Sequence, residues 1–284
     1  MATPRVSIPD TEVYPLHSQL INDDFELWCA RPQIGFVPSP PGPPYVLYVL
    51  DANLFFGTAV EMTRLMHKLY GELPPLLVVG IAYPTEDGFL QGALRNRDFT
   101  PSADAGLASM PMPLPQPDQP AKVEPVLGGA NTFLRFLKEE VKPLVAAHFD
   151  IAPENSTIFG ASLGGLFTIY SLFKEPTAFD NYIAVSPSLW WDNEMMFDLE
   201  LGEVIADGAT NIFLAVGAQE EALEIPILPQ FKMITNVRRM ANQLSQQRRE
   251  SLDVTLDVIE GETHTSVVPV ALTRGLRYVL TTKD

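Results

Sequence analysis

Ser162 stands where a covalent nucleophile is expected. Residues 160–164 (GASLG) match the pattern G-x-S-x-G, with a β-type run before it and an apolar run of helical character after it. In such a strand–turn–helix the serine hydroxyl is lifted above the edge of the sheet, and Gly160 and Gly164 avoid collisions there. The pattern predicts that Ser162 is a nucleophile and that the Leu163 N–H, at the helix start, binds an oxyanion. The alternative is a glycine-rich turn that only joins a strand to a helix.

A serine hydroxyl needs a base near neutral pH, and the chain has four histidines. His264 lies in a polar loop between the last expected strand and the last expected helix. An α/β sheet brings such loops to the carboxyl edge of its strands, so His264 is the predicted base. For His17, His67 and His148 we expect surface or capping roles.

A carboxylate is expected after a strand that lies between the serine and the histidine in sequence, where it would orient the imidazole. The apolar run 212–216 predicts that strand, and Glu220 lies in its exit loop. Glu220 is the predicted acid, and the order Ser162, Glu220, His264 is that of α/β hydrolases. The alternatives are Glu221, Glu224 and Asp192, or a solvated loop carboxylate without a role.

The second oxyanion donor is expected in the loop after an early strand. Residues 45–50 form a nearly continuous apolar run, and Asp51, Ala52 and Asn53 follow it. We predict that the Asn53 N–H is this donor. Helix capping is the other interpretation of the segment, and the two roles are compatible.

The elements that must position these residues alternate between strands and helices. Buried strands are expected at 45–50, 76–82, 156–160, 182–185, 211–216 and 252–259, and a further strand at 26–30. Helices are expected at 54–70, 131–145, 163–174, 231–249 and 267–280. The pattern predicts one α/β domain over residues 1–284, with a mostly parallel sheet and helices on both faces.

Proline marks two segments of the chain. The 26 prolines include clusters at 38–44 and 111–125. Residues 84–129 are expected to be irregular, because proline at alternate positions is incompatible with a helix or a central strand. Since catalytic candidates lie on both sides of each cluster, neither is a linker between domains. We predict that the inserted proline-rich loop, about 84–130, forms a rim or lid beside the active site.

Composition excludes several classes of partner. Lys+Arg is 19 and Asp+Glu is 35, a net charge of −16, which disfavours nucleic acid and anionic membranes as partners. The lone cysteine, Cys29, excludes an intrachain disulfide and is expected to be buried. No apolar run reaches the length of a membrane span, and we expect a cytoplasmic protein. No zinc pattern, phosphate-binding loop or dinucleotide fingerprint occurs, so neither metal nor cofactor is expected.

Six segments resemble the Putative esterase family, the esterase D-like α/β hydrolases that include enterobactin and salmochelin trilactone esterases. They are 49–53 (VLDAN), 95–101 (RNRDFTP), 159–165 (FGASLGG), 186–191 (SPSLWW), 216–217 with Glu220, and 261–264 (GETH). The resemblance implies an α/β-hydrolase fold and hydrolysis of carboxylic esters through an acyl-enzyme, without metal or cofactor. Ala52 departs from the glycine common in the family.

The resemblance also suggests substrate contacts. An iron-bound catecholate siderophore is an anion, and Arg95, Arg97 and Arg64 are the candidates to bind it. For Arg95 and Arg97 the alternative is ion pairs with Asp98 or its neighbours. Trp190 and Trp191 follow an expected strand end and are candidates for an aromatic pocket wall, with core packing as the alternative. The other functional interpretations are acyl transfer or peptide cleavage with the same triad, and an inert binding protein of the same fold.

Overall fold

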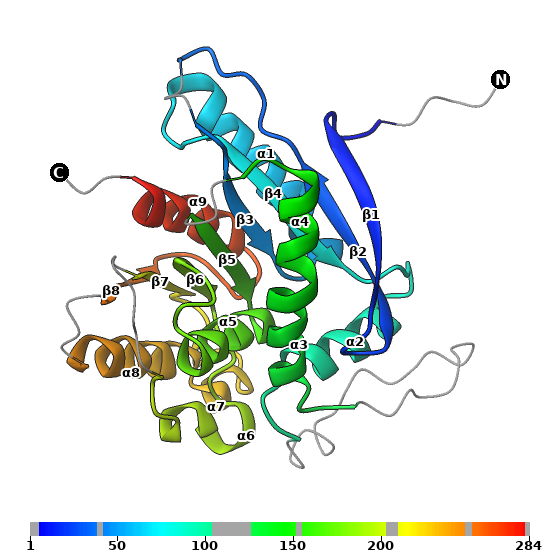
Figure 1. Ribbon diagram of the computed structural model, residues 1–284. Coiled ribbons are helices and arrows are strands. Elements are labelled where there is room, and N and C mark those ends of the chain that lie inside the picture. Colours follow the sequence, from blue (N-terminus) through cyan, green and yellow to red (C-terminus); the bar gives the residue numbers. More distant parts are fainter. Residues whose placement is uncertain are drawn as a thin grey trace.

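One eight-stranded sheet organises the structure. The computed structural model describes residues 6–38, 42–103, 126–151, 155–202, 210–247 and 252–281 (Figure 1). Its strand order is β1-β2-β4-β3-β5-β6-β7-β8, with β2 antiparallel to both β1 and β4 and all other neighbours parallel. The strands are β1 (Thr11–Ser18), β2 (Asp23–Ala30), β3 (Tyr45–Val49), β4 (Leu76–Ala82), β5 (Ser156–Ala161), β6 (Asn181–Val185), β7 (Thr210–Gly217) and β8 (Leu252–Ile259).

Helices cover both faces of this sheet (Figure 1). The longer ones are α1 (Ala52–Tyr70), α2 (Gly88–Phe99), α5 (Leu163–Lys174), α8 (Met233–Gln246) and α9 (Val267–Leu280). A further helical stretch consists of α3 (Ala130–Phe136), the π-helical turn η2 (Leu137–Val141) and α4 (Lys142–His148). Short turns complete the set: α6 (Trp191–Glu194), η3 (Met195–Asp198) and α7 (Leu228–Phe231).

The two faces of the sheet belong to two separate apolar clusters. Side chains of α1 and α9 pack with one face, while those of α3, α5 and α8 pack with the other. Successive residues of a strand alternate between them: Ile158 belongs to the second cluster and Phe159 to the first. Burial on both faces explains the continuous apolar runs in the sequence. The predicted α/β architecture is confirmed.

The structure corrects the prediction for residues 84–129. Helix α2 forms within this segment, and the Asp87 side chain caps it by accepting from the N–H groups of Phe89 (2.9 Å) and Leu90 (3.4 Å). No proline lies between Pro84 and Pro101, so nothing there opposes a helix. The predicted lid at 111–125 lies outside the described residues, as does part of the 38–44 cluster.

Two other features depart from the predictions. No strand is predicted before residue 26, yet β1 pairs with β2 along its whole length. Four of its eight side chains are exposed, and Pro15 is tolerated because β1 lies at the edge of the sheet. The helix predicted at 131–145 contains the π-helical turn η2. No helix in the described ranges is long and apolar enough to cross a membrane.

Candidate active site

Ser162 occupies a strained turn between β5 and α5. Its backbone has φ 58° and ψ −119°, a conformation that non-glycine residues rarely adopt outside functional sites. The Ser162 N–H donates to Val185 O (3.0 Å), and Ser162 O accepts from the Ser188 N–H (3.1 Å). The turn is thereby fixed against the segment that follows β6. The strand–turn–helix expected around this serine is present.

Two glycines permit this turn. A Cβ at Gly160 would lie 2.2 Å from Gly164 O, and one at Gly165 would lie 2.9 Å from Val185 O. A Cβ at Gly164 would lie 3.3 Å from Asp51 Oδ2 and 3.6 Å from the Leu50 side chain, without meeting any backbone atom at closer range. The close packing therefore depends most on Gly160 and Gly165, whereas the sequence pattern pointed to Gly160 and Gly164.

Glu220 and His264 are in direct contact. His264 Nδ1 lies 2.6 Å from Glu220 Oε2, while Glu220 Oε1 accepts from Ser186 Oγ (2.5 Å) and from the Gly217 N–H (2.8 Å). The Glu220 side chain is 1% exposed and that of His264 is 43% exposed. A carboxylate held in this way favours the tautomer with its proton on Nδ1, which leaves Nε2 as the basic nitrogen.

Adjacent strands bring these two side chains together. Glu220 follows β7 and His264 follows β8, and the Gln219 N–H donates to Glu262 O (3.0 Å) across the two exit loops. A Cβ at Gly217 would lie 2.4 Å from Glu262 O, so glycine is needed for this approach. The carboxyl-edge placement predicted for Glu220 and His264 is what the structure shows.

The alternative carboxylates are placed elsewhere. Glu221 accepts from the N–H (2.7 Å) and hydroxyl (3.0 Å) of Thr235 in α8, and Asp192 accepts from Ser102 Oγ (2.6 Å). Glu224 is exposed. Of the four candidates, Glu220 is the one that hydrogen-bonds to His264.

Two serines after β6 were not predicted as site residues. Ser188 Oγ lies 3.4 Å from Ser162 Oγ, and Ser186 Oγ donates to Glu220, so the segment 186–188 connects the nucleophile turn with the acid. Within the described residues no hydrogen bond joins Ser162 directly to His264; such contacts often tighten only when substrate binds. The signal for these serines is their place in the 186–191 segment, which they share with the two tryptophans.

Asn53 lies in the first turn of α1. Its side chain accepts from the Tyr83 N–H (2.9 Å) and donates to Tyr83 O (3.0 Å), which ties the loop after β3 to the end of β4. First-turn N–H groups have no acceptor within their own helix, so the Asn53 N–H suits an oxyanion. The same holds for the Leu163 N–H of α5. Ala52 is the first residue of α1 and has no positive φ, so alanine fits there.

Arg95 and Arg97 are both engaged by carboxylates, which corrects the expectation of a free basic patch. Arg95 Nε and Nη2 donate to the two oxygens of Asp51 (2.8 and 2.9 Å). Arg97 donates to Asp98 (2.7 and 3.0 Å) and to Asp23 (2.6 Å). The pairing with Asp98 is the alternative considered from the sequence. Both guanidiniums therefore have carboxylate partners within the protein.

The two tryptophans differ in role. Trp191 is fully buried, and its Nε1 donates to Ser102 Oγ (3.2 Å), so it belongs to the core and not to a pocket wall. Trp190 is partly buried, with its ring centroid 5.1 Å from that of Phe231. Trp190 is therefore the one that stays a candidate for substrate contact.

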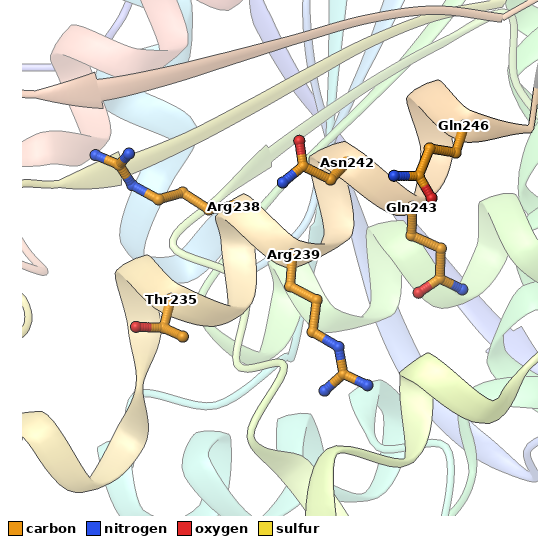
Figure 2. Close-up of a pocket in the computed structure, with 6 residues that line it drawn as sticks. All are labelled: Thr235, Arg238, Arg239, Asn242, Gln243 and Gln246. Atoms are coloured by element: carbon orange, nitrogen blue, oxygen red, sulfur yellow. The ribbon is translucent and has the colours of Figure 1, made fainter.

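The surface hollow on α8 lies apart from these residues. A shallow hollow on α8 is shown in Figure 2, and none of the predicted site residues lines it. The residues around it are Thr235, Arg238, Arg239, Asn242, Gln243 and Gln246. In the part of the chain that the structure describes, no group of three or more His, Cys, Asp or Glu side chains could hold a metal.

Comparison with known proteins identifies the family. A sequence profile of the Putative esterase family matches residues 32–266. The chain belongs to this family. It is 33% identical to the ferri-bacillibactin esterase BesA of Bacillus subtilis, over 96% of this chain and 91% of that protein. It is 27% identical to a siderophore triacetylfusarinine C esterase of Aspergillus fumigatus, over 95% of this chain and 93% of that protein.

The fold agrees with this assignment. The crystal structure of the BES protein from Bacillus cereus superposes with a TM-score of 0.81 at 32% identity, covering 99% of this chain and 100% of that one. The predicted α/β-hydrolase fold and the predicted activity, hydrolysis of carboxylic esters by a serine hydrolase, are confirmed. The alternative of an inert binding protein is set aside.

Proposed function

We propose that this esterase hydrolyses the ester bonds of a siderophore, with Ser162, His264 and Glu220 as its catalytic triad. The observation that carries the triad is the 2.6 Å contact of the buried Glu220 with His264, at the sheet edge where Ser162 occupies its strained turn. The substrate class rests on the relatives, since BesA and the fungal enzyme are named for siderophore esters.

The reaction follows from the positions of the groups. Ser162 Oγ attacks the ester carbonyl carbon while His264 Nε2 accepts the hydroxyl proton. The carbonyl oxygen gains the negative charge and accepts from the N–H groups of Leu163 and Asn53. The C–O bond to the alcohol then breaks, and His264 returns the proton to the leaving oxygen. Water then attacks the acyl carbon while His264 takes its proton, the bond to Ser162 Oγ breaks, and His264 returns the proton to that oxygen, which releases the acid.

Glu220 holds this base in place. Its Oε2 faces His264 Nδ1, and its Oε1 is fixed by Ser186 and Gly217. A negative charge against Nδ1 stabilises the imidazolium that forms when Ser162 loses its proton. Because these donors are neutral, the charge of Glu220 is available to the imidazolium.

A panel of esters tests the proposal. It contains a short-chain nitrophenyl ester, a triscatecholate trilactone and a hydroxamate ester siderophore, the last two with and without ferric iron. We expect cleavage of at least one siderophore ester with a kcat/KM well above that of the nitrophenyl ester, and loss of all turnover in Ser162→Ala. Cleavage of simple esters alone would overturn the siderophore assignment.

Product analysis distinguishes ester hydrolysis from acyl transfer and peptide cleavage. Free acid and alcohol are expected, with no new ester when an alcohol acceptor is added and no cleavage of peptide amides. A small-molecule ester is the partner that this proposal requires, and a cytoplasmic location stays a prediction that cell fractionation tests.

A further inference from the structure

Asp51 occupies the N-cap position of α1, but its side chain makes no capping hydrogen bond. It precedes the first residue of α1, where an aspartate side chain ordinarily accepts from a first-turn N–H. Here the carboxylate makes no such hydrogen bond, and the backbone is left-handed (φ 51°, ψ 46°). The Leu54 N–H is already bound to Asp51 O (2.8 Å), so the N–H that the side chain would ordinarily take is that of Asn53.

Arg95 holds this carboxylate instead. Arg95 lies in α2, 44 positions after Asp51, and its Nε and Nη2 donate hydrogen bonds to the two carboxylate oxygens of Asp51. The Asp51 side chain is 4% exposed and that of Arg95 is 21% exposed. Burial disfavours the charge of Arg95, but Asp51 outweighs this effect and raises the pKa of the guanidinium. Asp51 and Arg95 thus form a bidentate, largely buried ion pair.

The pair lies beside both proposed oxyanion donors. Asp51 Oδ2 lies 3.3 Å from the position that a Cβ of Gly164 would take, next to the start of α5. The Leu50 N–H donates to Phe159 O (3.0 Å), so the chain before Asp51 is also joined to the end of β5. An unpaired negative charge at this place would repel a developing oxyanion, and a carboxylate bound to the Asn53 N–H would block it.

We propose that Arg95 is a positioning residue, which keeps the oxyanion hole open by holding the Asp51 carboxylate away from the Asn53 N–H and neutralising it. Arg95 thus serves catalysis without touching the substrate. This inference rests on the proposed function, because it requires Asn53 and Leu163 to bind the oxyanion formed after attack by Ser162.

The test removes the cation and then the anion. Arg95→Gln frees the Asp51 carboxylate, and we expect kcat to fall roughly 100-fold, as when an oxyanion donor is lost, with KM changed less than about 3-fold. In Arg95→Gln/Asp51→Gly the carboxylate is absent, and glycine accepts the positive φ. This double variant is expected to regain at least about 10-fold in kcat. Arg135→Gln, which breaks an exposed pair with Glu139, is the matched control and leaves kcat unchanged.

Binding of an aryl boronic acid, which forms a tetrahedral adduct with the serine, gives a second measurement. Its affinity is expected to fall in Arg95→Gln and to recover in the double variant, in parallel with kcat. Circular dichroism and titration of active sites with a fluorophosphonate restrict both comparisons to folded enzyme. A double variant as slow as Arg95→Gln, or a single variant as fast as wild type, would overturn the proposal.

The experiments distinguish a failure of the proposed function from a failure of the role proposed for Arg95. If Ser162→Ala retained esterase activity, the triad itself would be wrong. If activity depended on Ser162 and yet Arg95→Gln did not reduce kcat, only the role of Arg95 would be wrong.

Discussion

The proposed active site lies at the carboxyl edge of the sheet, and its two sides are stabilised by different interactions. On the side of β6, β7 and β8, neutral donors and one imidazole surround the Glu220 carboxylate. On the side of β3 and β4, arginines of α2 neutralise the buried carboxylates of Asp51 and Asp98. A carboxylate that must stabilise a transient imidazolium is left without a permanent cation, whereas carboxylates that only shape the backbone receive one.

Removing the base is expected to have the largest effect. His264→Ala should lower kcat for a nitrophenyl ester by about 10⁴-fold or more, because Ser162 then has no proton acceptor. His148→Ala is the control: its Nδ1 hydrogen-bonds to Leu144 O of its own helix and its ring packs against Tyr14 of β1, so kcat should stay within about 2-fold of wild type. Equal activity of the two variants would contradict the assignment of the base.

Neutralising the acid is expected to have the next largest effect. Glu220→Gln keeps the size of the side chain but removes the charge that faces His264 Nδ1, and kcat should fall about 10³- to 10⁴-fold. Glu221→Gln changes a neighbouring carboxylate that binds Thr235, and its effect on steady-state turnover should be within about 2-fold. The reverse ranking would show that the wrong glutamate carries the triad.

Much of the proposed triad could be predicted because its signals are local. Ser162 lies in a five-residue pattern, and His264 and Glu220 each follow an apolar run that ends at the same sheet edge. Long-range contacts could not be predicted. Asp51, the partner of Arg95, is 44 positions away in sequence. Without knowing this partner, the sequence cannot show whether Arg95 binds substrate or holds the fold together.

Other failures have equally physical causes. Two adjacent tryptophans look alike in sequence, but full burial and the hydrogen bond to Ser102 separate Trp191 from Trp190. Helix α2 was not predicted because the prolines that follow it dominate the pattern of residues 84–129. Strand β1 has one buried side chain among eight, so its pattern lacks the apolar alternation by which strands are recognised.

On the β3–β4 side, breaking the second ion pair should affect stability more than rate. Arg97→Met leaves the Asp98 carboxylate, 2% exposed, without its cation, and should lower the free energy of unfolding by about 3 kcal/mol. Burial already raises the pKa of Asp98, and loss of Arg97 raises it further. Since protonated Asp98 needs no cation, the deficit should be smaller at about pH 5 than at about pH 8. Urea denaturation at both pH values measures it, and an unchanged midpoint would contradict the account.

The smallest effect is expected at Cys29 on β2. Burial raises the pKa of this thiol from 9.0 to about 12, so the thiolate is nearly absent at neutral pH. A raised pKa means that folding disfavours the thiolate, so this group contributes stability fully below pH 9.0, and that contribution is lost as pH rises toward about 12. Iodoacetamide at about pH 8 should leave the native protein unmodified and alkylate it in denaturant. Rapid alkylation of the native protein would show a second reactive nucleophile.

The most direct measurement of the central claim is the mass of the intact protein after treatment with a fluorophosphonate, followed by peptide mapping. The account predicts one adduct per chain, located on Ser162, with esterase activity lost in proportion to labelling. Ser162→Ala should take up no label, while Ser188→Ala, which lacks the neighbouring hydroxyl, should still be labelled on Ser162. Equal labelling of wild type and Ser162→Ala, or an adduct on another residue, would contradict it.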